Sequence, residues 1–387
     1  MPKDQTVPQA RLWVEQLKLT DFRNYRKLDM ALDPSPVVLV GDNGAGKTNV
    51  LEAVSLLAAG HGLRRAPYAE IARMDGRGGW AVAARLHGGA GVVEIGTGLT
   101  EPGDEGGGRI VRIDGATVRG TAKLGELVRM VWLTPAMDGL FTGPASDRRR
   151  FLDRLIQILD PGHRSEAARF ERAMRQRNRL FETHEVRGTV FEGLETQLAE
   201  SGVAIAAARL EAVERLGGLL AERPDKGVER PFPWATLALE GLLEQRLADE
   251  AAVEVEDFYR RKLAENRERD RAAKRTLEGP HRSDLIVGYG PKHVLARSCS
   301  TGEQKALLVG LIVAHSELVK QHFGGLAPLL LLDEIPAHLD AERRLALFGE
   351  IARLGAQAWM TGTDGAVFEP LRKTAQIFTV ADGGVRL

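Results

Sequence analysis

The octapeptide GDNGAGKT, from Gly41 to Thr48, decides the fold class. It follows the apolar run Val37–Val40 and precedes a segment in which apolar residues recur at helical spacing from Val50 onward. A strand, a glycine-rich turn and a helix N-terminus together direct backbone N–H groups at phosphates. The sequence therefore predicts a phosphate-binding loop within an α/β domain.

Each residue of this loop is a candidate nucleotide contact. Glycines let the backbone approach an anion without a Cβ atom in the way. Lys47 is expected to reach the β- and γ-phosphates, and Thr48 to place its hydroxyl on Mg²⁺. The predicted cofactors are ATP and Mg²⁺, and the predicted contacts are Gly41, Asp42, Asn43, Gly44, Ala45, Gly46, Lys47 and Thr48. The alternative, a chance glycine-rich turn before a helix, does not account for the flanking patterns.

A second apolar run ends in two carboxylates. Leu329–Leu332 is continuously hydrophobic, as buried parallel strands are, and Asp333 and Glu334 follow it directly. We expect Asp333 to hold Mg²⁺ through water. Glu334 is the candidate general base toward an attacking water, which makes Glu334 and Lys47 the predicted catalytic residues. A strand that simply ends in solvated acids is the alternative interpretation.

A third motif, Ser300-Thr301-Gly302-Glu303-Gln304-Lys305, precedes another apolar segment. Ser300 with Glu303 three residues later predicts a capping box at the start of a helix. Because a helix N-terminus favours anions, Ser300 and Gly302 are candidate phosphate contacts. If this helix and the phosphate-binding loop cannot reach one nucleotide in the same chain, a second copy must complete the site. The alternative is an ordinary capped core helix.

The segment between these motifs is rich in Ala, Leu, Glu and Arg, a composition that favours helices. We predict an α/β domain made of residues 1–145 and 281–387, interrupted by a helical lobe at residues 146–280. That insertion is too short for a long antiparallel coiled coil.

Charge is clustered although its sum is zero, with 53 basic and 53 acidic residues. Arg148–Arg179 holds ten arginines against four acids, and Arg260–Arg275 holds eight basic residues against three acids. Such clusters suit the DNA backbone, and no motif for base readout accompanies them. Solvated helix faces with i,i+4 ion pairs are the alternative, and Arg148–Arg150 could equally brace an ATP site or a dimer interface. The candidate DNA contacts are Arg148, Arg149, Arg150, Arg175 and Arg177.

The single cysteine, Cys299, excludes a disulfide framework and fits a reducing cytosol. The sequence contains no run of eighteen apolar residues, so no membrane-spanning helix is predicted. The N-terminal segment lacks the apolar core of a signal peptide. We expect a cytoplasmic protein with no membrane partner.

The three nucleotide motifs, in this order, resemble the ABC-type ATPase heads of the SMC-like group. The segment His338–Asp340 resembles the D-loop of that group, and Thr363 occupies the position of its switch histidine. One branch, the RecF family of bacterial recombination mediators, is similar over nearly the whole chain. Leu19–Tyr25 resembles the family's block LxxFRNY, Lys47–Ala53 resembles KTNLLEA, and Arg148–Asp153 resembles RRRFLD. Gly279–Asp284 resembles a further block of the family. The family usually has Gln-Gln-Arg where this chain has Glu303-Gln304-Lys305.

The resemblance implies an α/β fold with an ABC-type P-loop ATPase head and an inserted α-helical arm lobe. It adds Arg23 and Thr363 to the expected ATP contacts and makes Ser300–Lys305 a signature motif that caps the ATP of a second copy. It implies an ATP-dependent homodimer with weak, DNA-stimulated ATPase activity that resets DNA binding.

The same resemblance implies a role in recombinational repair and replication. The expected partners are DNA with single-strand gaps or single-strand/double-strand junctions and mediators of the RecR and RecO type, with RecA loading as the outcome. Alternatives are a transporter ATPase subunit, another SMC-like DNA clamp, or a P-loop nuclease of the overcoming-lysogenization-defect type. The large helical insertion and the basic clusters disfavour the transporter subunit.

Overall fold

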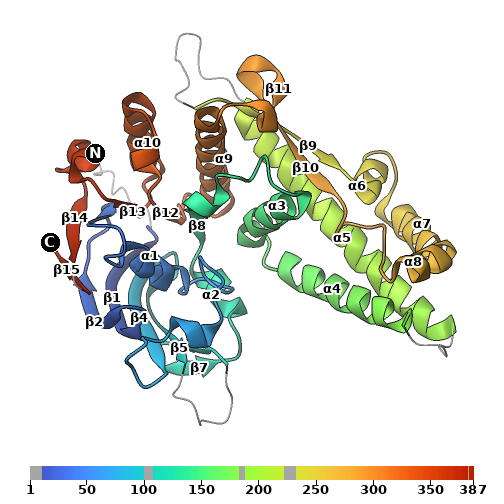
Figure 1. The fold of residues 1–387 in the computed structure, drawn as a ribbon, viewed down its shortest axis with the longest axis horizontal. Coiled ribbons are helices and arrows are strands. Elements are labelled where there is room, and N and C mark those ends of the chain that lie inside the picture. Colours follow the sequence, from blue (N-terminus) through green and yellow to red (C-terminus); the bar gives the residue numbers. More distant parts are fainter. Residues whose placement is uncertain (1–10, 100–107, 183–187, 222–231, 382) are drawn as a thin grey trace, which may run out of the picture. The chain divides into compact units, whose positions relative to one another are not determined.

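The computed structural model describes residues 11–99, 108–182, 188–221, 232–381 and 383–387 (Figure 1). The chain divides into two compact units. The first comprises Met1–Asp138, Glu229–Phe232 and Leu308–Leu387, and the second comprises Gly139–Val228 and Pro233–Leu307. An α/β domain interrupted by a helical insertion is thus confirmed.

The insertion is longer than the predicted lobe at residues 146–280. It begins at Gly139 and continues to Leu307, because strand β10 (Asp284–Tyr289) pairs antiparallel with β9 (Ala235–Glu240) over six residue pairs. Ser300 and Gly302 therefore belong to the second unit, whereas the predicted boundary placed them with residues 281–387 in the ATPase head.

A six-stranded sheet in the first unit carries the motifs. Five of its strands are parallel, and the order is β15-β14-β3-β13-β12-β8. The bounds are β3 (Val37–Val40), β8 (Met130–Leu133), β12 (Leu329–Leu332), β13 (Ala358–Gly362), β14 (Gln376–Ala381) and β15 (Gly384–Arg386). The carboxyl ends of β3, β12 and β13 meet at one edge, where parallel sheets bind ligands.

A second, antiparallel sheet completes this unit in the order β2-β1-β4-β5-β6-β7. Its bounds are β1 (Trp13–Phe22), β2 (Tyr25–Ala31), β4 (Trp80–Gly88), β5 (Gly91–Leu99), β6 (Ile110–Ile113) and β7 (Ala116–Val118). Buried and exposed residues alternate along β4, as expected of a sheet with one covered face. Leu19 of β1, Leu51 of α1 (Lys47–Ser55) and Trp359 of β13 share one hydrophobic core.

The remaining helices of the first unit are α2 (Ala122–Leu127) and α10 (Ala341–Leu354). Helix α9 (Thr301–His322) begins in the second unit and continues into the first. None of the described helices is long and apolar enough to cross a membrane.

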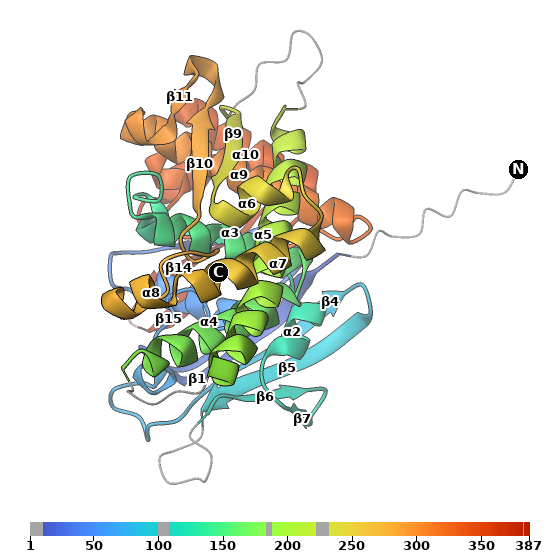
Figure 2. The same ribbon diagram turned by 90° about the vertical axis from the view of Figure 1, so that its right-hand side faces the viewer.

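The second unit is built on helices α3 (Ala145–Leu159), α4 (His163–Leu180), α5 (Gly188–Ala221), α6 (Leu242–Leu247), α7 (Ala252–Glu265) and α8 (Arg267–Ala273). A three-stranded sheet in the order β11-β10-β9, with β11 at Val294–Leu295, packs with them (Figure 2). Phe170 of α4, Leu198 of α5 and Tyr259 of α7 are buried in a core separate from that of the first unit.

Candidate functional site

The phosphate-binding loop has the predicted strand–loop–helix context. It runs from the end of β3 to the first residue of α1, Lys47, and Gly44 and Gly46 have φ values of 84° and 112°. A Cβ atom on Gly46 would lie 2.5 Å from Asn24 Nδ2 and 2.8 Å from Tyr25 Oη. Only glycine therefore fits at this position, on both conformational and steric grounds.

Two residues of the block Phe22–Tyr25 hold the phosphate-binding loop by hydrogen bonds. Tyr25 Oη donates a hydrogen bond to the Gly46 carbonyl at 3.1 Å, and Asn24 Nδ2 donates to the Ala45 carbonyl at 3.1 Å. Burial raises the pKa of Tyr25, so this hydroxyl stays protonated and can donate. Asn24 and Tyr25 are not among the site residues predicted from the sequence. Their signal was the resemblance block itself, which lies directly before the loop in the sequence.

Lys47 lies over the loop. Its Nζ donates to the carbonyl oxygens of Gly41 at 2.7 Å and Asp42 at 2.9 Å, and the side chain is buried. A buried ammonium held by carbonyl groups alone matches a site for phosphate oxygens, which would form stronger, charge-assisted bonds with it.

Thr48 and Asp333 meet at the sheet edge. The Thr48 hydroxyl lies 2.9 Å from Asp333 Oδ1 and 3.1 Å from Oδ2, although 285 residues separate them. A hydroxyl and a carboxylate are the oxygen ligands that Mg²⁺ takes when nucleotide phosphates and waters supply the rest. No group of three or more His, Cys, Asp or Glu residues in the described part of the chain forms a metal cage. The residues present therefore fit a Mg²⁺ ion shared with a nucleotide.

A third hydroxyl joins this group. Thr361 Oγ1 donates to Asp333 Oδ1 at 2.8 Å and accepts from the backbone N–H of Glu334 at 2.8 Å. Thr361 is not among the site residues predicted from the sequence. The only signal was its position at the end of an apolar segment, two residues before Thr363.

The other predicted contacts of the first unit are placed differently. Arg23 binds the carboxylate of Glu52 with Nε and Nη2, at 2.8 and 2.7 Å, and donates to the Glu70 carbonyl. A contact between Arg23 and ATP would require this bidentate ion pair to open. Thr363 is exposed and follows Gly362, whose carbonyl accepts from the Gly41 N–H at 3.3 Å. Thr363 therefore lies next to the start of the phosphate-binding loop.

The predicted capping box is present at the start of α9. Ser300 N and Oγ each lie 2.9 Å from Glu303 Oε2, and the Glu303 N–H points back to Ser300 Oγ at 3.4 Å. Lys292 pairs with Glu303 and, together with the Ser300 hydrogen bonds, lowers the pKa of Glu303 to about 2. Ser300 and Gly302 are exposed, and a Cβ atom on Gly302 would meet nothing within 4 Å. This helix start is thus open to a ligand.

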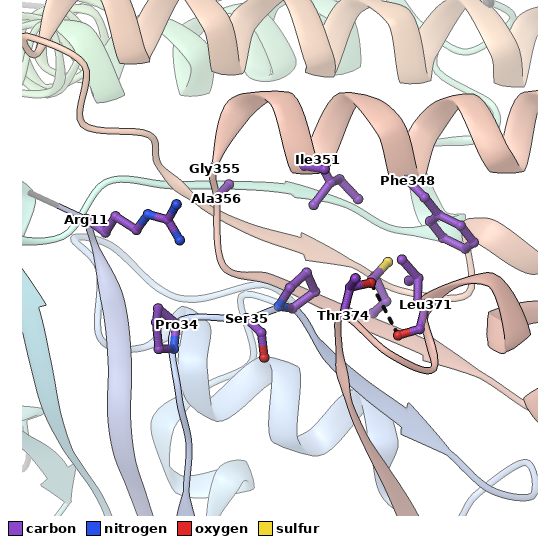
Figure 3. Close-up of a pocket in the computed structure, with 12 residues that line it drawn as sticks. Arg11, Pro34, Ser35, Phe348, Ile351, Gly355, Ala356, Leu371 and Thr374 are labelled. Carbon is purple, nitrogen blue, oxygen red and sulfur yellow. Dashed lines mark hydrogen bonds between the residues drawn. The ribbon is translucent and has the colours of Figure 1, made fainter. Parts of the chain in front are cut away.

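A pocket of about 190 Å³ in the first unit does not belong to this site (Figure 3). Pro34 and Pro36, which precede β3, line it together with Phe348, Ile351 and Leu371. It lies at the amino-terminal end of β3, whereas the phosphate-binding loop follows the carboxyl end. A largely apolar lining also does not suit a triphosphate.

Known proteins are similar to the chain over almost their whole length. The RecF/RecN/SMC N-terminal domain family matches residues 13–385. The chain is 56% identical to the DNA replication and repair protein RecF of Mesorhizobium japonicum, over 97% of this chain and 98% of that protein. It belongs to the RecF family. RecF of Brucella suis biovar 1 is 50% identical, with 96% of each chain covered.

Solved structures show the same fold. The recombination mediator protein RecF-ATPrS in the RecFOR pathway matches with a TM-score of 0.83 at 20% identity, covering 98% of each chain. An Smc head domain from Pyrococcus furiosus matches with a TM-score of 0.54 at 15% identity, over 97% of this chain and 95% of that one. As a RecF-family member with a complete phosphate-binding loop and paired carboxylates, the chain is an ABC-type ATPase.

The five arginines predicted from the basic clusters as DNA contacts differ in exposure, and Arg148 and Arg149 are half-buried. Arg148 makes a bidentate pair with Asp284, both bonds at 2.8 Å, and Arg149 donates to the Ser283 carbonyl at 2.6 Å. Both brace the second unit internally. Arg150 and Arg175 are exposed.

Arg177 is a wrong prediction as a DNA contact. Its side chain is 0% exposed and donates to Glu195 at 3.2 Å, Asp270 at 2.7 Å and the Leu263 carbonyl at 2.7 Å. The charge serves a buried network, because a guanidinium can be desolvated only when it is paired and hydrogen-bonded.

This network joins the two basic clusters of the sequence. Arg177 and Asp270 are 93 residues apart in the chain, and Asn178 Oδ1 accepts from both the N–H and the hydroxyl of Thr276, at 2.8 and 2.9 Å. The end of α4 therefore packs against α8 and the residues that follow it. We call the exposed basic residues of these two segments the arm basic surface: Arg172, Arg175, Arg179, Arg269, Arg271, Lys274 and Arg275.

Proposed function

We propose that this RecF-family ATPase is an ATP-switched DNA clamp of recombinational repair and replication. ATP joins two copies, the pair holds DNA at single-strand gaps or single-strand/double-strand junctions, and slow hydrolysis releases it. The supporting observation is that the site is split between two kinds of element. The phosphate-binding loop with Lys47 and Thr48, together with Asp333 and Glu334 at the end of β12, would hold the phosphates from one side. The exposed helix start at Ser300 is a separate place where an anion could bind.

The residues of the first unit have separate roles in hydrolysis. Lys47 would neutralise the β- and γ-phosphates, and Thr48 with Asp333 would hold the Mg²⁺ that accompanies the nucleotide. Glu334 is half-buried beside this pair and accepts a proton from the attacking water. Thr363 contacts the nucleotide from the neighbouring strand end, and Arg23 does so only after leaving Glu52.

DNA is proposed as the ligand on two grounds. Relatives over 50% identical carry the name DNA replication and repair protein RecF. The arm basic surface also gathers cations from two parts of the sequence, and such a surface binds phosphates without reading bases. We infer mediators of the RecO and RecR type as partners, RecA loading as the outcome and the cytoplasm as the location.

Retention on gapped DNA with ATP, ADP or no nucleotide tests this function. Wild type should be retained with ATP only. Lys47→Arg should lose both hydrolysis and retention, because a planar guanidinium cannot replace a compact ammonium between two phosphates. Glu334→Gln should stay on DNA with ATP while hydrolysis falls by about 10²- to 10⁴-fold.

Glu342→Gln, in the exposed first turn of α10, removes the same charge outside the site and should change neither measurement. Normal hydrolysis by Lys47→Arg at saturating ATP would contradict the loop assignment. Loss of ATP binding in Glu334→Gln would make Glu334 a structural residue and not the base.

A further inference from the structure

Thr361 sits where β13 ends beside β12. Leu332 of β12 is opposite Met360 of β13, so the next residues along, Asp333 and Thr361, meet at the sheet edge. The Thr361 side chain is completely buried. Its single hydroxyl forms both of the 2.8 Å hydrogen bonds described above, to Asp333 Oδ1 and from the Glu334 N–H.

The chemistry of the partners fixes the direction of both bonds. An ionised carboxylate only accepts and a backbone N–H only donates, so the Thr361 hydroxyl must donate to Asp333 and accept from Glu334. The Thr361 hydroxyl oxygen thus connects, through two hydrogen bonds, the side chain of Asp333, which is proposed to hold Mg²⁺, and the backbone of Glu334, the proposed base.

The backbone conformation of Glu334 is unfavourable without a stabilising contact. Its φ is 57°, in the left-handed region that non-glycine residues rarely adopt. The chain therefore turns directly after Asp333, where β12 has ended. The hydrogen bond from the Glu334 N–H to Thr361 stabilises this turn.

Asp333 is held from two sides. Thr361 donates to Oδ1 from the neighbouring strand, and Thr48 approaches both carboxylate oxygens from the first turn of α1. Thr361 thereby fixes the rotation of the carboxylate while lone pairs remain on the side of Thr48. Partners of this kind set the orientation of metal ligands.

We propose that Thr361 is a positioning residue that couples the Mg²⁺ ligand Asp333 to the general base Glu334. This inference rests on the roles proposed above for those two carboxylates. Without the hydroxyl, the metal ligand can rotate and the base loses the contact that supports its turn, while the phosphate-binding loop is untouched.

Thr361→Val tests the proposal because valine keeps the shape and removes the hydroxyl. We expect kcat for ATP hydrolysis to fall about 10- to 100-fold, the usual effect of losing a partner of a metal ligand. The Mg²⁺ concentration for half-maximal activity should rise, while ATP affinity measured without Mg²⁺ stays unchanged. Thr361→Ser restores the hydroxyl and should recover most of the activity.

Thr97→Val is the matched control. Thr97 is a buried threonine of β5 whose hydroxyl donates to the Ile110 carbonyl at 3.0 Å and accepts from Arg109 Nε at 2.7 Å, so its loss tests general destabilisation. Its hydrolysis should match wild type at a temperature where both valine variants are folded by circular dichroism. If Thr361→Val misfolds, the proposal is tested on Thr361→Ser against Thr361→Ala, of which only serine should retain hydrolysis and Mg²⁺ affinity.

Glu334→Gln separates this inference from the proposed function. If that variant is inactive and Thr361→Val keeps wild-type kcat and Mg²⁺ dependence, the positioning role is wrong and the function stands. If Glu334→Gln hydrolyses ATP normally, Glu334 is not the general base, and the proposed function is contradicted before the role of Thr361 is tested. Equal losses in Thr361→Ser and Thr361→Val would also overturn the proposal.

Discussion

His281 belongs to the block Gly279–Asp284, and its Nε2 donates to the Thr276 carbonyl at 3.0 Å. Burial lowers its pKa from 6.5 to about 4, against the opposing effect of that hydrogen bond, and the nearby charges of Arg282 and Arg149 lower it further. Nδ1 is buried without a hydrogen-bond partner in the described part of the chain. The folded chain therefore holds this imidazole neutral.

This histidine predicts a pH dependence of stability. The unfolded chain takes up a proton near pH 6.5 and the folded chain only near pH 4, so the stabilisation is complete above pH 6.5 and is lost as the pH falls toward 4. The difference is about 3 kcal/mol at most. Urea unfolding between pH 7.5 and 4 should show it, and His281→Gln should flatten the profile in that window. An identical profile in the variant would contradict the assignment.

Single residues could be predicted as site candidates from the sequence where a short local motif surrounds them. Lys47, Thr48, Asp333 and Glu334 each stand in a short motif that states its own context. Thr361 could not be found this way, since its role depends on the register of β13 against β12. The burial of Arg177 depends on Asp270, 93 residues away, so its charge was taken for a surface feature.

At the scale of elements, α9 connects the two units. Its first turn carries the exposed capping box of Ser300, and its later residues belong to the first unit. The sequence predicted the start of this helix because a capping box is local. It did not predict that Ser300 belongs to the helical unit, since that follows from the pairing of β10 with β9, whose first residues are about fifty positions apart.

Ser300→Arg tests this helix start as a trans contact. The variant should bind ATP as a monomer nearly as well as wild type but should neither dimerise nor hydrolyse, because a bulky cation blocks the approach to a second copy's nucleotide. Light scattering with ATP and Mg²⁺, beside nucleotide-binding measurements, gives both readouts. Ser165→Arg, exposed near the start of α4, is the control and should dimerise. A wild type that hydrolyses ATP as a monomer on gapped DNA would rule out the trans site.

At the scale of the whole molecule, the net charge is zero, so attraction to DNA has to come from a local cluster of basic residues. The arm basic surface is the cluster that we propose, and the salt dependence of DNA binding tests it. Log affinity for DNA should fall linearly with log salt, with a slope of about −0.9 per phosphate contact. Arg172→Gln with Arg175→Gln should make that slope shallower by about one to two. Arg26→Gln with Lys27→Gln, at exposed positions of β2, removes equal charge and should leave the slope unchanged. Equal slopes in both double variants would make the arm residues a solvated helix face.

The order of strands around β3 has a consequence for how the chain is made. β3 lies between β13 and β14, which are translated more than three hundred residues later. At about 5–20 residues per second, β3 leaves the ribosome tens of seconds before either neighbour exists. The helical unit can fold in that interval, but the phosphate-binding loop cannot be fixed until the last strands arrive. We therefore expect a chain that lacks β13 and β14 to bind ATP poorly, because β3 then has no neighbouring strand on either side.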